Sequence, residues 1–384
     1  SFMESDDLVY RKLQKHLDRM PVGFPESLSG TDIKLLKDMF TIDEAEIALE
    51  LSMLPESAER IFPRLKNRFS NAKELEVKLD DMMEKGLILG GKLLSKDDKK
   101  KLYSNAQFAV GMYEFHIDRM TERLANNFLD YFQNSFIKEA FKDTKGPGQM
   151  HTIPIGKSII RENYTETYEN VKEILKTTTG PIVLNDCVCR ITHDIAGDKC
   201  KLSDLRETCI ALKSVAQYCI DAGRGRLVSK EEALALIDKF EEVGFVIQPE
   251  NNKNPEFICC CCGCCCAVLN MAKQFPKPAE KYSSNYYASV DTEKCAGCGT
   301  CTTRCRMDAI SLKNEKAVVN LDRCIGCGLC TSTCKTGAVA LNKKEKTTVP
   351  PANHVALYQE IFMKKVGPFA AVKTMIKYKL GMKV

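Results

Sequence analysis

A repeated cysteine spacing near the carboxyl end of the chain constrains its fold more than any other feature. Two runs share the spacing Cys-x2-Cys-x2-Cys-x3-Cys, namely Cys295, Cys298, Cys301 and Cys305, and then Cys324, Cys327, Cys330 and Cys334. Glycine occupies matching places between the cysteines of both runs. Gaps this short bring three thiolates around one cubane, and small residues let backbone N–H groups approach its sulfides. The repeat therefore predicts two [4Fe–4S] clusters.

The spacing resembles that of bacterial two-cluster ferredoxins over residues 284–345. In such proteins the fourth cysteine of each run binds the other cluster. The expected ligand sets are therefore Cys295, Cys298, Cys301 and Cys334 for one cluster, and Cys324, Cys327, Cys330 and Cys305 for the second. Zinc knuckles seldom use three evenly spaced cysteines plus a fourth, so zinc is disfavoured. Arg306 and Lys335 stand where the ferredoxin pattern usually has proline, which leaves the reduction potentials and the path of the exiting chain open.

The whole chain has 384 residues, enough for two or three domains that each bury a core. Its net charge of +5, from 56 basic and 51 acidic residues, is too balanced to indicate nucleic-acid binding. The 20 cysteines are clustered like metal ligands, and the chain shows no signal peptide. We therefore expect the reducing cytoplasm of an anaerobe, because exposed [4Fe–4S] clusters are sensitive to oxygen. No apolar run approaches the length of a membrane span.

The pattern of helices and strands predicts an α+β multidomain protein. Its expected parts are an arm (1–28), a winged-helix-like helical domain (29–145), a Cys-rich α/β middle domain (146–283), the dicluster ferredoxin-like domain (284–345) and a basic tail (346–384).

The helical domain has the outline of a winged helix. Thr41 with Glu44, and Asn71 with Glu74, predict two helix starts. Residues 87–94 predict a short hairpin around two glycines, and residues 103–142 predict further helix. The would-be recognition helix after Asn71 carries five acidic residues, which would face a phosphate backbone badly. We therefore expect a packing or docking module, with DNA binding as the disfavoured alternative.

The middle domain carries further cysteines. Cys187 and Cys189, in a Cys-x-Cys-Arg sequence, follow a predicted buried strand, and Cys200 and Cys209 come soon after. This set suits a third iron–sulfur centre or a zinc site. Residues 203–222 predict a helix, in which free cysteine behaves as a small hydrophobe. Core packing is therefore the alternative for Cys209, and it is our assignment for the later Cys219.

Residues 259–266 hold seven cysteines around Gly263. Adjacent side chains of an extended segment point to opposite faces, so Cys259 and Cys261 are expected to face a centre from which their neighbours point away. Gly263 permits a sharp turn that brings the last three cysteines back. We therefore take Cys259, Cys261 and Cys264 as metal ligands or redox-active thiols. The alternative is that these cysteines fill tight spaces.

The basic tail ends in a predicted amphipathic helix. Six lysines and no acidic residue follow Glu360, and Phe369, Val372, Ile376 and Leu380 share one side of that helix. We expect the tail to pack back on the protein with its lysines in solvent. The alternative is contact with an acidic partner or with anionic lipid, as a peripheral membrane attachment.

The full pattern is similar to ferredoxin-type proteins of anaerobes that join a helical part to a Cys-x-Cys-Arg segment, a CCCCGCCC tract and a terminal dicluster domain. That resemblance implies iron–sulfur redox work and supplies no substrate. We expect an electron-transfer protein that passes single electrons through two clusters to a middle-domain centre or to a partner redox protein. Two alternatives are a reductase with its own active site at the middle-domain cysteines and a redox-responsive DNA-binding regulator. No dinucleotide fingerprint or P-loop is present.

Overall fold

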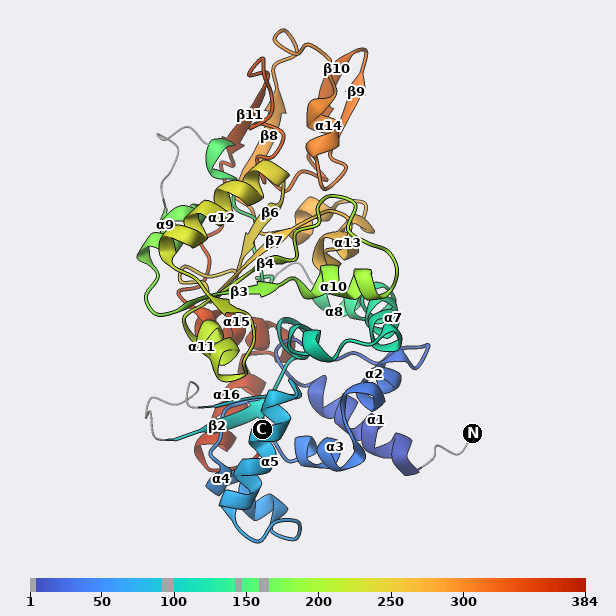
Figure 1. Ribbon diagram of the computed structural model, residues 1–384, viewed down its shortest axis with the longest axis vertical. Coiled ribbons are helices and arrows are strands. Elements are labelled where there is room, and N and C mark those ends of the chain that lie inside the picture. Colours follow the sequence, from blue (N-terminus) through green and yellow to red (C-terminus); the bar gives the residue numbers. More distant parts are fainter. Residues whose placement is uncertain (1–4, 92–99, 142–146, 159–165) are drawn as a thin grey trace.

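The computed structural model describes residues 5–91, 100–141, 147–158 and 166–384. Three parts follow one another along its long axis (Figure 1). The N-terminal helices lie at one end, a sheet with its own helices lies in the middle, and two pairs of strands of the predicted ferredoxin domain lie at the other end. The two C-terminal helices run back toward the N-terminal helices. The fold is therefore mixed helix and sheet, as expected.

The N-terminal part is built from short helices around one core. They are α1 (Ser5–Leu17), α2 (Thr31–Met39), α3 (Ile42–Leu49), α4 (Ala58–Leu65), α5 (Ala72–Glu84), α6 (Tyr113–Phe115), α7 (Glu122–Tyr131) and α8 (Ile137–Ala140). The predicted capping box of Thr41 and Glu44 starts α3, and the Asn71 side chain accepts the Glu74 N–H at the start of α5. Both caps satisfy N–H groups that a helix leaves unpaired, so these two helix starts are confirmed.

The predicted hairpin within residues 87–94 is wrong in its second strand. β1 (Ile88–Gly91) pairs with β2 (Leu102–Asn105) in antiparallel register, and residues 92–99 lie outside the described part of the chain. A Cβ at Gly90 would meet the buried Tyr103 ring at 2.6 Å, so this glycine admits a close-packed ring rather than forming the turn. The helix predicted over 103–142 is wrong in its first part, because β2 extends to Asn105.

The middle sheet has five strands, all paired antiparallel, in the order β5-β3-β4-β7-β6. Its strands are β3 (Ile182–Asp186), β4 (Glu207–Leu212), β5 (Arg226–Leu227), β6 (Val246–Pro249) and β7 (Phe257–Cys261), and its helices are α9 (Val171–Thr177), α10 (Val188–Ile195), α11 (Lys213–Asp221), α12 (Lys230–Val243) and α13 (Ala267–Lys273). Apolar residues of α9 and α12 share a core with one side of the sheet. The helix predicted over 203–222 is wrong in its first half. β4 lies at the centre of the sheet and is buried on both faces, with Ile210 and Leu212 in one core and Ala211 in another, and this burial overrides helix propensity.

The last part contains two antiparallel pairs of strands. β8 (Tyr286–Val290) pairs with β11 (Val339–Lys343), and β9 (Ile310–Lys313) pairs with β10 (Lys316–Val319). The short helix α14 (Thr300–Arg304) follows Gly299. Cysteines of both runs share a small core with these strands.

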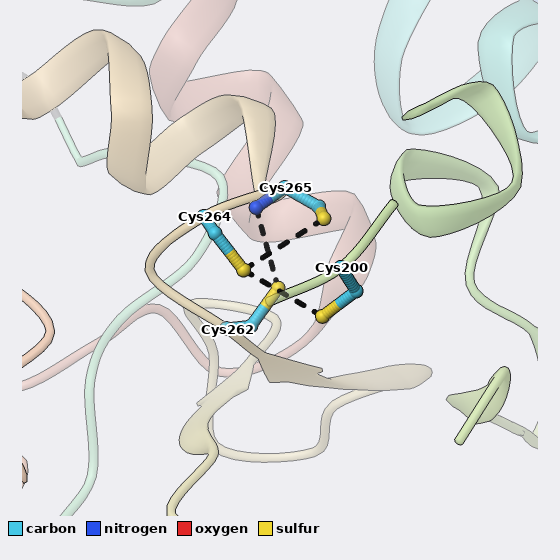
Figure 2. A group of neighbouring side chains, drawn as sticks. All are labelled: Cys200, Cys262, Cys264 and Cys265. Carbon is cyan, nitrogen blue, oxygen red and sulfur yellow. Dashed lines mark hydrogen bonds between the residues drawn. The ribbon is translucent and has the colours of Figure 1, made fainter. Parts of the chain in front are cut away.

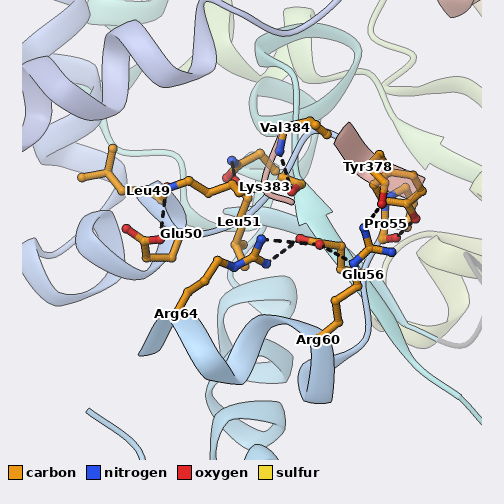
Figure 3. A network of polar contacts seen from close by, with 12 residues as sticks. Leu49, Glu50, Leu51, Pro55, Glu56, Arg60, Arg64, Tyr378, Lys383 and Val384 are labelled. Atoms are coloured by element: carbon orange, nitrogen blue, oxygen red, sulfur yellow. Dashed lines mark hydrogen bonds and ion pairs between the residues drawn. The ribbon is translucent and has the colours of Figure 1, made fainter. Parts of the chain in front are cut away.

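The C-terminal segment packs back on the N-terminal helices, as expected, but Lys365 does not lie in solvent as predicted for the lysines of the tail. It contains α15 (His354–Val366) and α16 (Pro368–Lys379). Lys365 Nζ donates to the carbonyls of Asp18 and Met20 at 2.7 and 3.0 Å. The backbone N–H of Val384 donates to Ser52 Oγ at 3.1 Å, and the Tyr378 hydroxyl donates to the Pro55 carbonyl (Figure 3).

The predicted apolar side of α16 is not the side that packs back. Its four members, Phe369, Val372, Ile376 and Leu380, are all exposed, Phe369 by 92 %. Contact of this side with a partner or a lipid surface stays a prediction. Among the helices of the described residues, none is long and apolar enough to cross a membrane.

Replacing Glu56 is expected to destabilise the junction between the N-terminal helices and the C-terminal segment. Its side chain is fully buried and forms ion pairs with Arg60 Nε at 2.8 Å and Arg64 Nη2 at 2.5 Å (Figure 3). Removing one partner of a buried ion pair leaves charge uncompensated and costs about 3 kcal/mol or more. Glu56→Ala should therefore lower the urea midpoint clearly. Glu50, half-exposed in its pair with Lys383, is the control, because Glu50→Ala should cost less than about 1 kcal/mol. Equal effects of the two substitutions would contradict this account.

Candidate metal centres

The eight cysteines of the repeat lie in two groups. Cys301 is close enough to interact electrostatically with Cys295, Cys298 and Cys334. Cys327 interacts in the same way with Cys305, Cys324 and Cys330. The structure thus brings together the members of each predicted ligand set, including the exchange of the fourth cysteine between the runs. Ligation by these residues stays a prediction.

Backbone amides donate hydrogen bonds to three of these eight sulfur atoms. Three N–H groups donate to cysteine sulfurs at 3.3 to 3.4 Å: Ala288 to Cys324, Ala309 to Cys305, and Ala317 to Cys295. Hydrogen bonds to sulfur stabilise the negative charge of a cluster with its ligands and help to set its potential. The residues present therefore fit a [4Fe–4S] cluster in each group.

The glycines between the cysteines are required by close backbone contacts. Gly297 and Gly326 have φ of +67° and +66°, and a Cβ at either would come within 2.2 Å of a carbonyl oxygen, of Glu315 and Tyr286 respectively. Side chains rarely adopt this backbone conformation, and no side chain tolerates such a contact. Gly297 and Gly326 are thus explained by steric need, whereas a Cβ at Gly299 would meet nothing closer than 3.7 Å.

A second kind of site lies in the middle domain. We call it the compact sulfur site, and it consists of Cys200, Cys262, Cys264 and Cys265 (Figure 2). Their sulfur atoms all lie within 4.8 Å of one another. The distance from Cys264 Sγ is 3.6 Å to Cys200 Sγ and 3.8 Å to Cys265 Sγ. Three of the four side chains are buried, and that of Cys264 is half-buried.

Two separate segments build the compact sulfur site. Cys200 lies in the loop after α10, whereas the other three lie in the turn between β7 and α13. Within that turn the N–H of Cys265 donates to Cys262 Sγ at 3.3 Å. Hydrogen bonds from Cys264 and Cys265 lower the pKa of the Cys262 thiol, although burial opposes this. This arrangement favours the thiolate form of Cys262, which is the form that binds a metal ion.

The spacing of these sulfur atoms decides what kind of metal the compact sulfur site fits. Metal–sulfur bonds of about 2.3 Å in a tetrahedron place the sulfur atoms about 3.8 Å apart. A cubane holds its ligands farther apart, because each sulfur binds a different iron. No other group of three or more His, Cys, Asp or Glu residues in the described ranges is equally tight, so the repeat cysteines are spaced more widely. The compact sulfur site therefore fits one four-coordinate ion, zinc or iron.

Sequence reasoning identified only half of the compact sulfur site. Cys200 and Cys264 were expected as ligands, whereas Cys262 and Cys265 were not. The expected alternation of faces fails because β7 ends at Cys261, so Cys262 already belongs to the turn. Gly263 was the signal that could have predicted Cys262 and Cys265 as members of the site, because a chain reversal at this glycine brings the cysteines on both sides of it together.

The remaining predicted ligands lie elsewhere. Cys187, Cys189, Cys209, Cys259 and Cys261 all line a cavity of about 260 Å³ between the sheet and the N-terminal helices, together with Cys266, which the sequence analysis did not single out. Cys209 stands opposite Cys259 across β4 and β7. Cys219 packs with Val183, Ala211 and Ala216, and burial raises the pKa of its thiol to about 11. That environment agrees with its assignment to the core.

Residues 294–339 match the family model described as a 4Fe-4S dicluster domain. This part of the chain is therefore a ferredoxin-type iron–sulfur domain, and the chain is an iron–sulfur protein with an additional cysteine-rich tract. No curated protein matches the chain in sequence.

Cys262→Ala is expected to remove one metal ion from each chain and to leave the amount of acid-labile sulfide unchanged. A mononuclear site contains no sulfide, whereas every cubane contains inorganic sulfur. Metal analysis combined with sulfide analysis checks this. Cys219→Ala is the control, because it removes a buried cysteine that is outside the compact sulfur site. A parallel loss of sulfide in Cys262→Ala would show that this site holds a cluster instead.

Proposed function

We propose that the protein is an iron–sulfur electron-transfer protein that passes single electrons through its dicluster domain to a cysteine-bound centre of the middle domain or to a partner redox protein. When bound, the clusters supply one-electron chemistry at low potential. The polypeptide holds the centres close together and sets their potentials through hydrogen bonds, burial and nearby charge. The cytoplasm of an anaerobe remains our expectation for where this takes place.

The observation that supports this proposal most directly is a shared core. Cys305, Cys324 and Cys327, from the second predicted ligand set, pack against the same hydrophobic core that contains Cys262, Cys265 and Cys266. Ile325 and Leu329, which separate the cysteines of that set, are buried in this core. This packing supports an arrangement in which the second predicted ligand set lies beside the cysteine tract, since no cysteine of the first set belongs to this core.

Two arginines of the dicluster domain bind the middle domain at the C-terminal end of α12. Arg304 donates to the carbonyls of Glu241 and Glu242 at 2.9 and 3.0 Å, and Arg306 Nε donates to that of Gly244 at 2.9 Å. The last carbonyls of a helix are unpaired and carry partial negative charge, so they favour cations. Arg306, in the place of the usual ferredoxin proline, thus directs the exiting chain against the middle domain.

A reductase with its own active site is the second candidate, and the cavity favours it. Glu114 lines this cavity, and burial raises its pKa to about 7, although the N–H of Gly111 donates to its carboxylate at 2.7 Å. A carboxyl group that is half-protonated near neutral pH is suited to deliver protons during a reduction. Glu114→Gln should slow turnover if reduction takes place in the cavity, and should leave electron uptake by the dicluster domain unchanged in either case.

For the N-terminal part we propose a packing role rather than DNA binding. The C-terminal carbonyls of α5, the would-be recognition helix, are bound by the middle domain. Arg224 Nη2 donates to the Glu84 carbonyl at 2.7 Å, and the Tyr218 hydroxyl donates to that of Met83 at 3.4 Å. A salt-dependent band shift on genomic fragments would favour the regulator instead.

The experiment that tests the proposed function is reductive titration of protein purified without oxygen. Reduction by dithionite should be reversible, should consume at least two electrons per chain and should give paramagnetic resonance signals of reduced [4Fe–4S] clusters. Sulfide analysis should find about eight sulfides per chain as a minimum. Colourless protein that contains zinc alone would refute the proposal.

A further inference from the structure

A cavity lined by thiols lies between the sheet and the N-terminal helices, and its volume is about 260 Å³. Protein interiors are close-packed, and voids larger than a water molecule are few. A cavity of this size at the centre of the chain therefore calls for an occupant. Its sulfur-rich lining indicates the chemical class of that occupant, since thiolates bind soft metal centres.

Four of the cavity cysteines form a connected group. Cys187 and Cys189 interact with each other at the start of α10, and Cys261 and Cys266 interact with each other across the turn before α13. The two pairs also interact electrostatically, Cys261 with both Cys187 and Cys189, and Cys266 with Cys189. Within this group Cys259 interacts only with Cys261, and it also interacts with Cys209, which is outside the group.

The four sulfur atoms are not drawn together like those of the compact sulfur site. Within the described residues only the compact site has ligand atoms that all lie within 4.8 Å. Wider separation around an open volume is what a multinuclear cluster needs, because each ligand binds a different iron. The repeat cysteines likewise include no three sulfur atoms that all lie within 4.8 Å of one another.

Two buried polar groups lack the partner that an anionic cluster would provide. The Tyr282 hydroxyl lines the cavity near Cys261 and Cys266, and among the described atoms it has no hydrogen-bond partner, although the residue is only 8 % exposed. Arg190, next to Cys189 in sequence, does not line the cavity but interacts electrostatically with Cys187 and Cys261; it is fully buried, and its Nε lacks a partner among the described atoms. Unpaired buried groups are expensive, and cluster sulfur accepts hydrogen bonds.

We infer that the cavity holds a third [4Fe–4S] cluster, with Cys187, Cys189, Cys261 and Cys266 as its ligands. This inference deepens the proposed function, on which it rests, because it names the middle-domain centre that exchanges single electrons with the dicluster domain. The compact sulfur site, with its single ion, is then a neighbouring structural or tuning site.

Counting acid-labile sulfide in anaerobically purified full-length protein tests the inference. Three cubanes give about twelve sulfides per chain, whereas two give about eight. Cys266→Ala should therefore lose one third of the sulfide. Cys259→Ala is the matched control, since it removes a thiol from the same cavity and should keep about twelve. Retention of all sulfide by Cys266→Ala, or its loss from Cys259→Ala, overturns the ligand set.

The sulfide content of the wild-type protein tests the third cluster even if a variant does not fold. About eight sulfides in the wild type would overturn the third cluster and leave the proposed function intact, whereas no sulfide would overturn both. Partial removal of iron with a chelator, followed by alkylation with iodoacetamide and mass spectrometry, maps the ligands without substitution. Cys187, Cys189, Cys261 and Cys266 should become reactive together as one third of the sulfide is lost. Independent reactivity of these four thiols would contradict the assignment.

Discussion

Alanine in place of Gly326 is expected to halve the cluster content of the dicluster domain. The added Cβ would come within 2.2 Å of the Tyr286 carbonyl oxygen and 2.6 Å of its carbon, and the φ of +66° is strained for any side chain. Tyr286 begins β8, whose next residues include the Ala288 N–H that donates to Cys324. Relief of the clash must therefore displace either Cys324 and Cys327 or the strand that supports them. Iron and sulfide analysis should show about four irons fewer per chain.

Gly337 provides a control that separates the clash from the backbone strain. It has the same φ of +66°, and a Cβ there meets nothing within 4 Å. Gly337→Ala should therefore cost about 1 to 2 kcal/mol for the left-handed conformation alone and should retain full cluster content. If both variants lost iron equally, conformational strain rather than steric contact would explain the role of the glycines.

The dicluster domain was predictable because its information is local. Each run places three cysteines and two glycines within a few residues, so spacing alone specifies which sulfur atoms converge, and only the fourth ligand comes from the other run. The two helix caps were predictable for the same reason, since Thr41 and Glu44 satisfy each other's backbone N–H groups across one turn.

The middle-domain sites were only partly predictable because their members meet through tertiary structure. Cys200 reaches the compact sulfur site from a loop far from the cysteine tract in sequence, and no periodicity encodes that contact. Cys209 lies in a central strand, where pairing with both neighbours outweighs the helical pattern of residues 203–222. Seven adjacent cysteines also share one residue type, so sequence cannot separate those facing the compact site from those facing the cavity.

Replacing Arg190 with methionine is expected to change the stability of the protein in opposite directions with and without metal. The guanidinium is fully buried, lies 4.2 Å from the centre of the Phe245 ring, and donates to the Cys260 carbonyl at 3.2 Å. No ion pair joins it to a carboxylate of the described residues. Burial opposes its charge, but the nearby cysteines, Cys187 and Cys262 foremost, outweigh this and raise its pKa.

The physical reason is that a metal site with four thiolates carries a net negative charge. Arg190 interacts with cysteines of both the compact sulfur site and the cavity, so its positive charge balances part of that negative charge. Loss of the cation should weaken metal binding about 10- to 100-fold, the usual effect of removing a supporting group. In metal-free, reduced protein at a pH where the surrounding cysteines are protonated, the same cation is uncompensated, so an apolar replacement of similar length should be neutral or stabilising there. Chelator competition measures the first effect, and urea unfolding of the two forms measures the second.

Two further variants make this prediction specific to charge. Arg190→Lys keeps the cation and should recover part of the metal affinity. Arg206, whose Nη2 donates to Asp194 at 2.9 Å, already has a carboxylate partner, so Arg206→Met should shift the unfolding midpoint in the same direction whether metal is bound or not. If Arg190→Met destabilised the metal-free protein as strongly as the loaded one, Arg190 would be a packing residue whose charge the metal sites do not use.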